Sequence, residues 1–504
     1  MSTMAAIWRL LGYPSRTSPP PLETDDIYPT HMLDNADAIR DIVVVWTLRF
    51  NDVLDAGKLH GSLTRLLEIG DWRKLGGRLR VRADKKLEIH VPQAFTAERP
   101  AISYSHETIL LNIDEHPLAS TLPKATEGPS IQRGSADFQT LGARKDTPAT
   151  LDDFIYSDTP QISLHITSFN DATLVGLSFP HTLMDAMSQR ALLQAWSLVL
   201  AKKESKVPPL LGAKEDAICA AIEAETDETK QVFKLERMRL RGWSMFTFAL
   251  RFAWAIFWNP TVETKTIFLP REAISALKHQ AQQDIPLTDQ QLLSINDVLG
   301  AWVVHAIATS LPQPRPVTLL NAVNARARLP SLSQSPGVYI QNMVLAAFTF
   351  LSPADTTTDS LGSIALKNRQ HLTTQLTAPQ VFATLRELNT EARKSGNPQV
   401  LCGESDALLV PFTNWTHAAI IHAADFGPAV VRVGEVSGQS RRNPAGTMVF
   451  HHASAMRQSP FVRNVLVVFG RDFGGGYWLS GSFLPATWRK VEEEMERLAV
   501  KTRE

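Results

Sequence analysis

His181 is the residue of this chain best placed to do chemistry, because Asp185 follows it four positions later. Of the 14 histidines, His181 alone has an acidic residue at that spacing. A strand-like run ends at His181, and a helix-like run begins near Asp185. Such a histidine can act as a general base, taking a proton from a hydroxyl or an amine that then attacks a carbonyl group. The competing interpretation is structural, since the helix dipole favours an acid near a helix N-terminus.

The other residues of catalytic or metal-binding type give no second site. His451 and His452 are adjacent, but no third ligand stands at a useful spacing, so we expect no metal. Cys219 and Cys402 lie far apart and form no disulfide framework. This usage of cysteine favours a reducing compartment, the cytoplasm.

Composition limits the class of protein. The chain has 504 residues, 44% of them hydrophobic, and its 51 basic residues balance 51 acidic ones. The length suits two domains. The zero net charge argues against a generic nucleic-acid binder, which carries a basic excess.

The sequence predicts no secretory signal and no membrane-spanning segment. The N-terminal apolar stretch is interrupted by Arg9 and Pro14. The most apolar run, from Trp243 to Trp258, is too short to span a bilayer and has Arg251 at its middle. We expect a buried or interfacial helix there. The basic stretch before it also leaves peripheral membrane contact open.

The elements around His181 can be predicted from periodicity and turn residues. Gln161–Phe169 and Thr173–Phe179 are expected to be strands joined at Asn170–Asp171, followed by a helix from about Met184 to Leu200. The stretch 117–150 lacks periodicity and is predicted to be a long surface loop. Ser294 and Asp297 have the spacing of a capping box. Further strands and a final helix are expected at Asp41–Phe50, Thr264–Leu269, Val317–Val323, Met343–Phe350, Val430–Val433, Val465–Phe469 and around Trp488, Val491, Met495 and Leu498.

The segment around His181 resembles the core signature of the BAHD family of acyl-CoA-dependent acyltransferases. That signature has a strand pair, a histidine, three residues, Asp-Gly, and a helix ending in tryptophan. The matching residues are Thr167, Phe169, His181, Asp185 and Trp196. Ala186 stands where the family usually has glycine.

Further segments resemble the family in the same order along residues 28–500. The stretch SLTRLLEIGDWRKLGGRLRVRADKKLEIHV is similar to its N-terminal helix, Gly-Arg-Leu turn and strand. Other matches are Arg326, Arg328, Leu329, Tyr339 and Asn342, then Thr413 and Trp415, then Asp425, Phe426 and Gly427. The Asp-Phe-Gly-Trp-Gly motif is cut short by Pro428. A second Asp-Phe-Gly string begins at Asp472, but the spacing from Trp415 favours Asp425.

The resemblance implies a mixed α/β fold of two similar chloramphenicol-acetyltransferase-like domains, with a channel at their interface. We expect an N-terminal extension over residues 1–27, a first lobe over 28–202, a crossover with the aromatic helix over 203–262, and a second lobe over 263–504. Acyl-CoA and the acceptor would enter the channel from opposite faces.

The resemblance also implies roles for the matched residues. His181 would be the general base, with no covalent intermediate. Asp185 would pair with Arg326 and support the loop. Thr413 and Trp415 would line the acceptor side and stabilise the oxyanion, and Asp425 would shape the domain interface.

The residues that contact CoA cannot be identified by the resemblance. The candidates for its phosphates are four arginines, each with a solvated surface charge as the alternative: Arg441, Arg442, Arg457 and Arg463.

The leading hypothesis is therefore an acyl-CoA-dependent O-acyltransferase, of the fungal branch, that acts as a monomer. We expect acetyl-CoA as co-substrate and a hydroxylated terpenoid, alkaloid or polyketide as acceptor, with N-acylation still open. One rival is a condensation domain that uses carrier-bound acyl groups, but Pro180 and Ala186 depart from its pattern. Another is a non-catalytic small-molecule-binding protein, supported by the shortened motif at Asp425 and opposed by His181. A protein kinase is excluded because no His-Arg-Asp loop accompanies the Asp-Phe-Gly strings.

Overall fold

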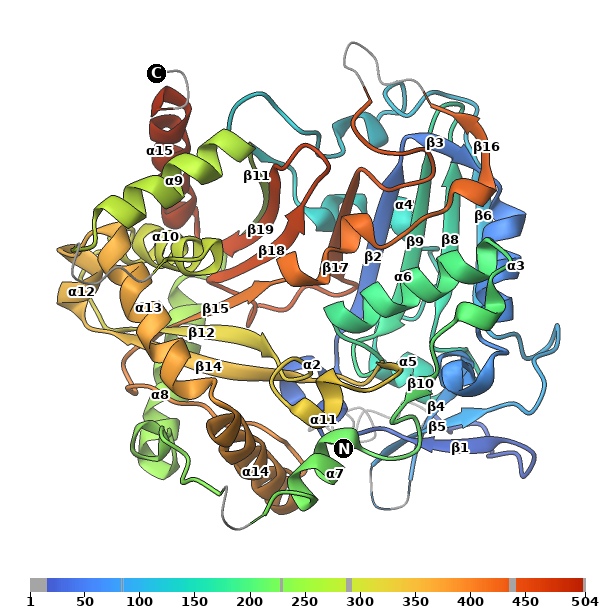
Figure 1. Ribbon diagram of the computed structural model, residues 1–504, viewed down its shortest axis with the longest axis horizontal. Helices are drawn as coiled ribbons and strands as arrows, with labels where there is room; N and C mark the ends of the chain where they lie inside the picture. Colours follow the sequence, from blue (N-terminus) through green and yellow to red (C-terminus); the bar gives the residue numbers. More distant parts are fainter. Residues whose placement is uncertain are drawn as a thin grey trace.

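Two mixed β-sheets with helices packed against them make up the computed structural model (Figure 1). It describes residues 16–82, 84, 86–226, 230–286, 292–434 and 441–501. The predicted mixed α/β class is confirmed.

The first large sheet has five strands in the order β17-β2-β9-β8-β6. Helices α3 and α6 lie on one side of it, and the short helix α4 contacts β2, β8 and β9. Because β2 and β9 are buried along their whole lengths, they appear in the sequence as continuous apolar runs. The elements are β2 (Val43–Phe50), α3 (Ala56–Leu66), β6 (Ser103–Thr108), α4 (Gln139–Gly142), β8 (Ser163–Ser168), β9 (Thr173–Pro180), α6 (Ala186–Leu200) and β17 (Phe450–Ala455).

The second large sheet has seven strands in the order β14-β12-β15-β18-β19-β11-β7. Four helices pack together beside it (Figure 1). The strands are β7 (Ser130–Gln132), β11 (Glu263–Leu269), β12 (Val317–Asn324), β14 (Val344–Leu351), β15 (Leu408–Asn414), β18 (Val465–Arg471) and β19 (Tyr477–Phe483), and the helices are α9 (Arg271–Gln283), α10 (Ile295–Thr309), α13 (Leu361–Gln375) and α15 (Pro485–Lys501).

The two lobes exchange strands. β17, from late in the chain, pairs with β2 of the first sheet, while β7, from early in the chain, pairs with β11 of the second. In addition, β16 (Val430–Val433) pairs with β3 (Asp52–Leu54). Each lobe therefore contains strands from both halves of the sequence. The proposed division into residues 28–202 and 263–504 does not coincide with the division between the two large sheets.

The prediction of a surface loop over 117–150 is wrong. This stretch contains β7 and α4, and Phe138 and Leu141 are buried. Its backbone passes so close to β9 that a Cβ atom at Gly176 would lie 2.0 Å from the carbonyl oxygen of Gly142. The elements are too short to show periodicity, and β7 finds its partner strand only in the other lobe.

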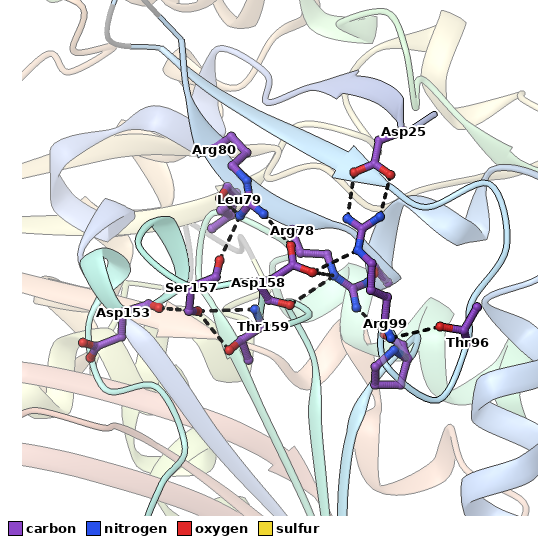
Figure 2. Close-up of polar contacts among 12 residues, drawn as sticks. Asp25, Arg78, Leu79, Arg80, Thr96, Arg99, Asp153, Ser157, Asp158 and Thr159 are labelled. Atoms are coloured by element: carbon purple, nitrogen blue, oxygen red, sulfur yellow. Dashed lines mark hydrogen bonds and ion pairs between the residues drawn. The ribbon is translucent and has the colours of Figure 1, made fainter. Parts of the chain in front are cut away.

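The arginine of the Gly-Arg-Leu turn, Arg78, is buried between a small sheet and the first lobe. Arg78 is fully buried and donates to the carbonyl oxygens of Gly76 and Pro100 at 2.7 and 2.8 Å. Burial lowers the pKa of Arg78 to about 10, and nearby Asp158 acts against this. Asp158 also accepts from Arg80 and Arg99 (Figure 2). The small sheet consists of β1 (Asp26–Pro29), β5 (Leu87–Val91) and β4 (Arg78–Val81).

The segment between the lobes carries several short elements and one aromatic helix. They are β10 (Leu210–Leu211), α7 (Ala217–Glu223) and α8 (Gly242–Trp258). Within the described part of the chain, no helix is long and apolar enough to cross a membrane. The other remaining elements are β13 (Val338–Tyr339), which pairs with β10, and α14 (Ala378–Ser395).

Two local predictions from the sequence are confirmed. Ser294 and Asp297 form a capping box at the start of α10. The predicted apolar face of α15, made by Trp488, Val491, Met495 and Leu498, is buried in the second lobe.

Candidate active site

His181 lies at the end of β9, where the strand ladder continues for one more residue. Its backbone N–H donates to the carbonyl oxygen of Ile42 at 2.8 Å, and Leu183 then donates back to Pro180 to close a turn. The helix α6 begins at Ala186, with Asp185 as its N-cap. The expected start at Met184 is therefore two residues early, because Asp185 caps the helix from outside it.

The ring of His181 is half-buried, and its two nitrogens differ. Nδ1 is buried and has no hydrogen-bond partner on another residue of the described chain, whereas Nε2 is not enclosed in this way. Burial lowers the pKa of His181 below its ordinary value of 6.5, although its own backbone carbonyl and Asp185 act to raise it. The ring is therefore neutral at pH 7, and a neutral imidazole with an open Nε2 can accept a proton.

Asp185 accepts hydrogen bonds from four donors, none of which is the imidazole of His181. Its Oδ1 accepts from the backbone N–H and hydroxyl of Ser188 at 3.1 and 2.9 Å. Its Oδ2 accepts from Arg326 Nη1 at 2.8 Å and from the N–H of Met343 at 2.9 Å. Burial acts to raise the pKa of Asp185, but Arg326 and the N–H donors outweigh burial, so the pKa lies below its usual value.

Arg326 joins three parts of the chain at this point. Besides Asp185, it donates to the hydroxyl of Ser188 at 3.0 Å and to the carbonyl oxygens of Tyr339 and Gln341. The structure thus brings Asp185 and Arg326 together in a buried ion pair between the lobes. Since both oxygens of Asp185 already accept from two donors each, the pair fixes the loop after His181, and neither oxygen hydrogen-bonds to the ring.

Asn342 holds the backbone of His181 directly. Its side-chain amide donates to the carbonyl oxygen of His181 at 2.9 Å and to Asp34 Oδ1 at 2.9 Å. The backbone N–H of Asn342 also donates to Asp34 Oδ1, at 2.8 Å. Burial raises the pKa of Asp34 to about 6. The loop that carries His181 is therefore held by Asn342, which also binds Asp34 from an early segment of the chain.

Three more titratable side chains, Lys74, His31 and Asp216, lie next to Asp34 and Gln341 in the same buried region. Lys74 Nζ lies 3.1 Å from His31 Nε2, and Asp216 accepts from the N–H of Met32 and from Gln341. Burial lowers the pKa of Lys74 to about 8 and that of His31 to about 4. Lys74 is the cation that faces both Asp34 and Asp216, and their charges act to raise the pKa of Lys74 against the effect of burial. A buried polar network of this kind favours one arrangement of the loop.

Thr413 and Trp415 lie together at the end of β15. The indole N–H of Trp415 donates to the hydroxyl of Thr413 at 3.1 Å, which leaves the Thr413 proton available to another acceptor. The indole lies parallel to the ring of His451, with centroids 6.4 Å apart, and packs edge-on against Phe469. Both residues are half-buried at the contact between the lobes.

Asp425 lies on the surface and starts a turn. Its Oδ1 accepts from the N–H of Gly427 at 3.1 Å. The next residue, Phe426, is buried; it stacks on Phe50 and packs at a tilt against Trp196 of the first lobe. The second Asp-Phe-Gly string has a separate role, since Asp472 accepts from the N–H groups of Gly474 and Gly476 in the turn between β18 and β19.

Two of the four candidate arginines for CoA already bind other groups of the protein. Arg441 forms a bidentate ion pair with buried Asp52 at 2.7 and 2.6 Å. Arg463 is buried and donates to the carbonyl oxygens of Ala255 and Asn259 at the end of α8. Arg442 and Arg457 are exposed.

The adjacent histidines belong to the aromatic core. His451 accepts from the indole of Trp46 at 3.2 Å, and burial lowers the pKa of His451 to about 3 and that of His452 to about 4. Among the residues that the structure describes, no group of three or more His, Cys, Asp or Glu could hold a metal ion.

The sequence did not single out Asp34 or Ser188. Asp34 follows a leucine in a short segment without periodicity, and its partner Asn342 lies 308 residues away. The only local signal for Ser188 is its position three residues after Asp185, where an N-cap carboxylate finds a donor.

Comparison with known proteins places this site in a family. The family model described as Transferase family matches residues 146–428. The O-acetyltransferase PaAT-2 of Phomopsis amygdali is 36% identical over 488 residues, which cover 94% of this chain and 98% of that protein. The acetyltransferase pyiB of Pyricularia grisea is 34% identical over 483 residues and covers 95% of each chain.

Solved structures show the same fold at low sequence identity. TRI101 of F. graminearum, complexed with coenzyme A and T-2 mycotoxin, superposes with a TM-score of 0.65 at 14% identity, over 94% of this chain and 98% of that one. Vinorine synthase superposes with a TM-score of 0.53 at 14% identity, over 96% of this chain and 95% of that one. The chain therefore belongs to the Transferase family, the BAHD-type acyltransferases, and is an acyltransferase.

Proposed function

We propose that this enzyme transfers an acetyl group from acetyl-CoA to a hydroxyl of a small secondary metabolite. The observation that carries the proposal is the environment of His181, a neutral, half-buried imidazole at a strand end, held through Asn342. The names of its relatives support the choice of acetyl and of oxygen as the nucleophile. A terpenoid, alkaloid or polyketide is the proposed class of acceptor.

The proposed reaction needs only one proton-transfer group. Nε2 of His181 takes the proton of the acceptor hydroxyl while its oxygen attacks the thioester carbonyl carbon. The resulting tetrahedral oxyanion collapses, the carbon–sulfur bond breaks, and the proton on His181 passes to the CoA thiolate. The products are the acetate ester and CoA, and no acyl group is attached to the protein.

Thr413 is the proposed donor to the oxyanion. Its hydroxyl accepts from Trp415, so its own proton can point at a developing negative charge. A preorganised donor of this kind is worth about 10²-fold in rate. Trp415 then has two functions, since it orients the hydroxyl and closes the acceptor side against His451.

Asp185, Arg326 and Asp425 are proposed to position the site rather than react. The ion pair fixes the turn after His181. Asp425 shapes the turn that delivers Phe426 to the lobe interface.

Arg457 is the preferred candidate for a CoA phosphate, followed by Arg442. Met456 donates to the carbonyl oxygen of Val43, and His181 donates to that of Ile42, so Arg457 lies near the same sheet edge as His181. Both arginines are exposed, which suits a mobile anionic co-substrate.

We further propose a monomer in the cytoplasm that touches membranes peripherally. Cys219 and Cys402 are free thiols, as in a reducing compartment.

Thermal unfolding with a panel of CoA thioesters tests the proposal without a known acceptor. A ligand at about 100 times its Kd adds about 2.7 kcal/mol of stability. We expect stabilisation by acetyl-CoA that is retained in His181→Ala, because the histidine acts on the acceptor. If no thioester stabilises the protein, an acyl-CoA-dependent activity is wrong.

A further inference from the structure

The helix α8 presents a continuous apolar stripe to solvent. Six large side chains recur three or four positions apart and therefore share one face. Their exposed fractions lie between 55% and 76%, far more than a folded protein usually leaves exposed on one helix. They are Trp243, Phe246, Leu250, Trp254, Phe257 and Trp258.

The opposite face of α8 is fixed to the second lobe. Met245 and Phe248 pack against its core, and Arg251 donates to the hydroxyl of Ser405 at 2.9 Å. Buried Arg463 donates to two carbonyl oxygens at the C-terminal end of the helix, at 3.0 and 2.9 Å. The stripe is therefore a fixed surface at the edge of the molecule (Figure 1).

A neighbouring loop packs against the other side of α8, away from the stripe. Phe461 is 67% exposed and stacks beside Phe252 of α8, with ring centroids 6.3 Å apart. Val462 is also exposed. A cavity of about 110 Å³ lies on the protein side of α8, between it and Ile307 and Leu311, so the stripe itself is not the wall of a ligand pocket.

The charges around the stripe favour an anionic partner. No acidic residue occurs in 242–258, and Arg251 stands at the margin of the stripe. Arg237 and Arg241 are exposed just before the helix. Glu236 forms an ion pair with Arg241, and exposed Glu404 and Asp406 flank the Ser405 that accepts from Arg251. The positive charge beside the stripe is therefore that of Arg237 and of α8 itself, which holds one arginine and no acid.

The composition of the stripe suits lipid better than protein. Its only polar side-chain atoms are indole N–H groups, since the Thr247 hydroxyl donates back to the helix. A protein interface usually surrounds its apolar core with a polar hydrogen-bonding rim. Tryptophan and arginine at the margins are typical of side chains at the boundary between lipid tails and headgroups.

We propose that the apolar stripe of α8 forms a seat that lies in the plane of an anionic phospholipid bilayer. The helix has 17 residues and is fixed along one side, so it would enter only the headgroup boundary. A seat of this kind would bring a small-molecule acyltransferase to the phase where lipophilic metabolites concentrate. The seat does not depend on the proposed acetyl transfer, because vesicle binding is measured without either substrate.

Vesicle flotation with the full chain tests the proposal. We expect binding to vesicles of phosphatidylcholine and phosphatidylserine, weaker binding to phosphatidylcholine alone, and partial release by salt, which screens the arginines. The double variant Trp254→Glu/Phe257→Glu should bind at least about tenfold more weakly, because it places two charges in the inserted face. Leu110→Glu, at a side chain 80% exposed on the other lobe, is the matched control and should bind like the natural protein.

Three results would overturn the seat. The first is no vesicle binding by the natural protein. The second is equal binding by the double variant while its thermal unfolding stays normal. The third is a dimer in light scattering that the double variant dissociates, without vesicle binding, which would mean that a second copy covers the stripe.

Discussion

Arg326 Nη1 lies 2.8 Å from Asp185 Oδ2, and this contact joins two segments that are 141 residues apart. The ion pair is buried, and Ser188 and Met343 complete the coordination of the carboxylate. This geometry explains how the acid four residues after the histidine can support it without a hydrogen bond between the two side chains. The acid holds the turn that carries the histidine.

Asp185→Asn should therefore destabilise the protein and lower its rate. Removing one charge of a buried pair costs about 3–5 kcal/mol, because the other charge stays buried and unpaired. Denaturant unfolding and soluble yield measure this effect. Asp137→Asn removes an exposed ion pair and should change stability by about 0.5 kcal/mol or less. A fully stable but inactive Asp185→Asn would mean that the carboxylate takes part in the chemistry.

His181→Ala should lower kcat/KM by about 10²–10⁴-fold, because no other group at this position can take the acceptor proton. Circular dichroism and stabilisation by acetyl-CoA should stay normal. His279→Ala, at an exposed histidine of α9, is the control and should keep full activity. Residual activity close to that of the control would exclude His181 as the base.

The pH dependence follows from the lowered pKa of His181. The active form is neutral, so kcat/KM should be constant above pH 6.5 and fall only below the depressed folded-state pKa. Below that pKa the rate should drop about tenfold per pH unit. Protonation of His181 and Asp185 also favours the unfolded chain, since both folded pKa values are lowered, so stability should be lost as the pH falls. A kcat/KM that declines already above pH 7 on acidification would contradict this environment.

Asn342→Ala should reduce kcat with little effect on the KM for acetyl-CoA. The variant removes the donor that holds the His181 carbonyl and leaves buried Asp34 with one partner fewer. We expect a loss of about 1–3 kcal/mol in unfolding free energy. Steady-state kinetics separate the two constants, and an increase in KM alone would show that Asn342 does not position the base.

Thr413→Val should lower kcat by about 10²-fold if its hydroxyl donates to the oxyanion. Valine keeps the volume of threonine, so the fold should tolerate it at this half-buried position. Binding of acetyl-CoA, measured by thermal shift, should be unchanged. An unchanged kcat would assign the oxyanion to another donor.

Several local features could be predicted from the sequence because they depend on neighbours along the chain. The strand pair follows from its apolar, β-branched runs and the turn residues Asn170–Asp171 between them, and the capping box at Ser294 follows from local hydrogen bonding. The motif around His181 placed that residue between a strand and a helix, where the structure has it.

Other features were decided only by the tertiary structure. The strand exchange through β7 and β17 and the burial of Asp34 beneath His181 depend on segments that meet after folding. The periodicity of the sequence cannot predict such contacts, because the partners lie hundreds of residues apart. The tertiary structure also decided that Arg441 and Arg463 are paired within the protein. It likewise left the apolar face of α8 exposed, because no other part of the described chain covers that face.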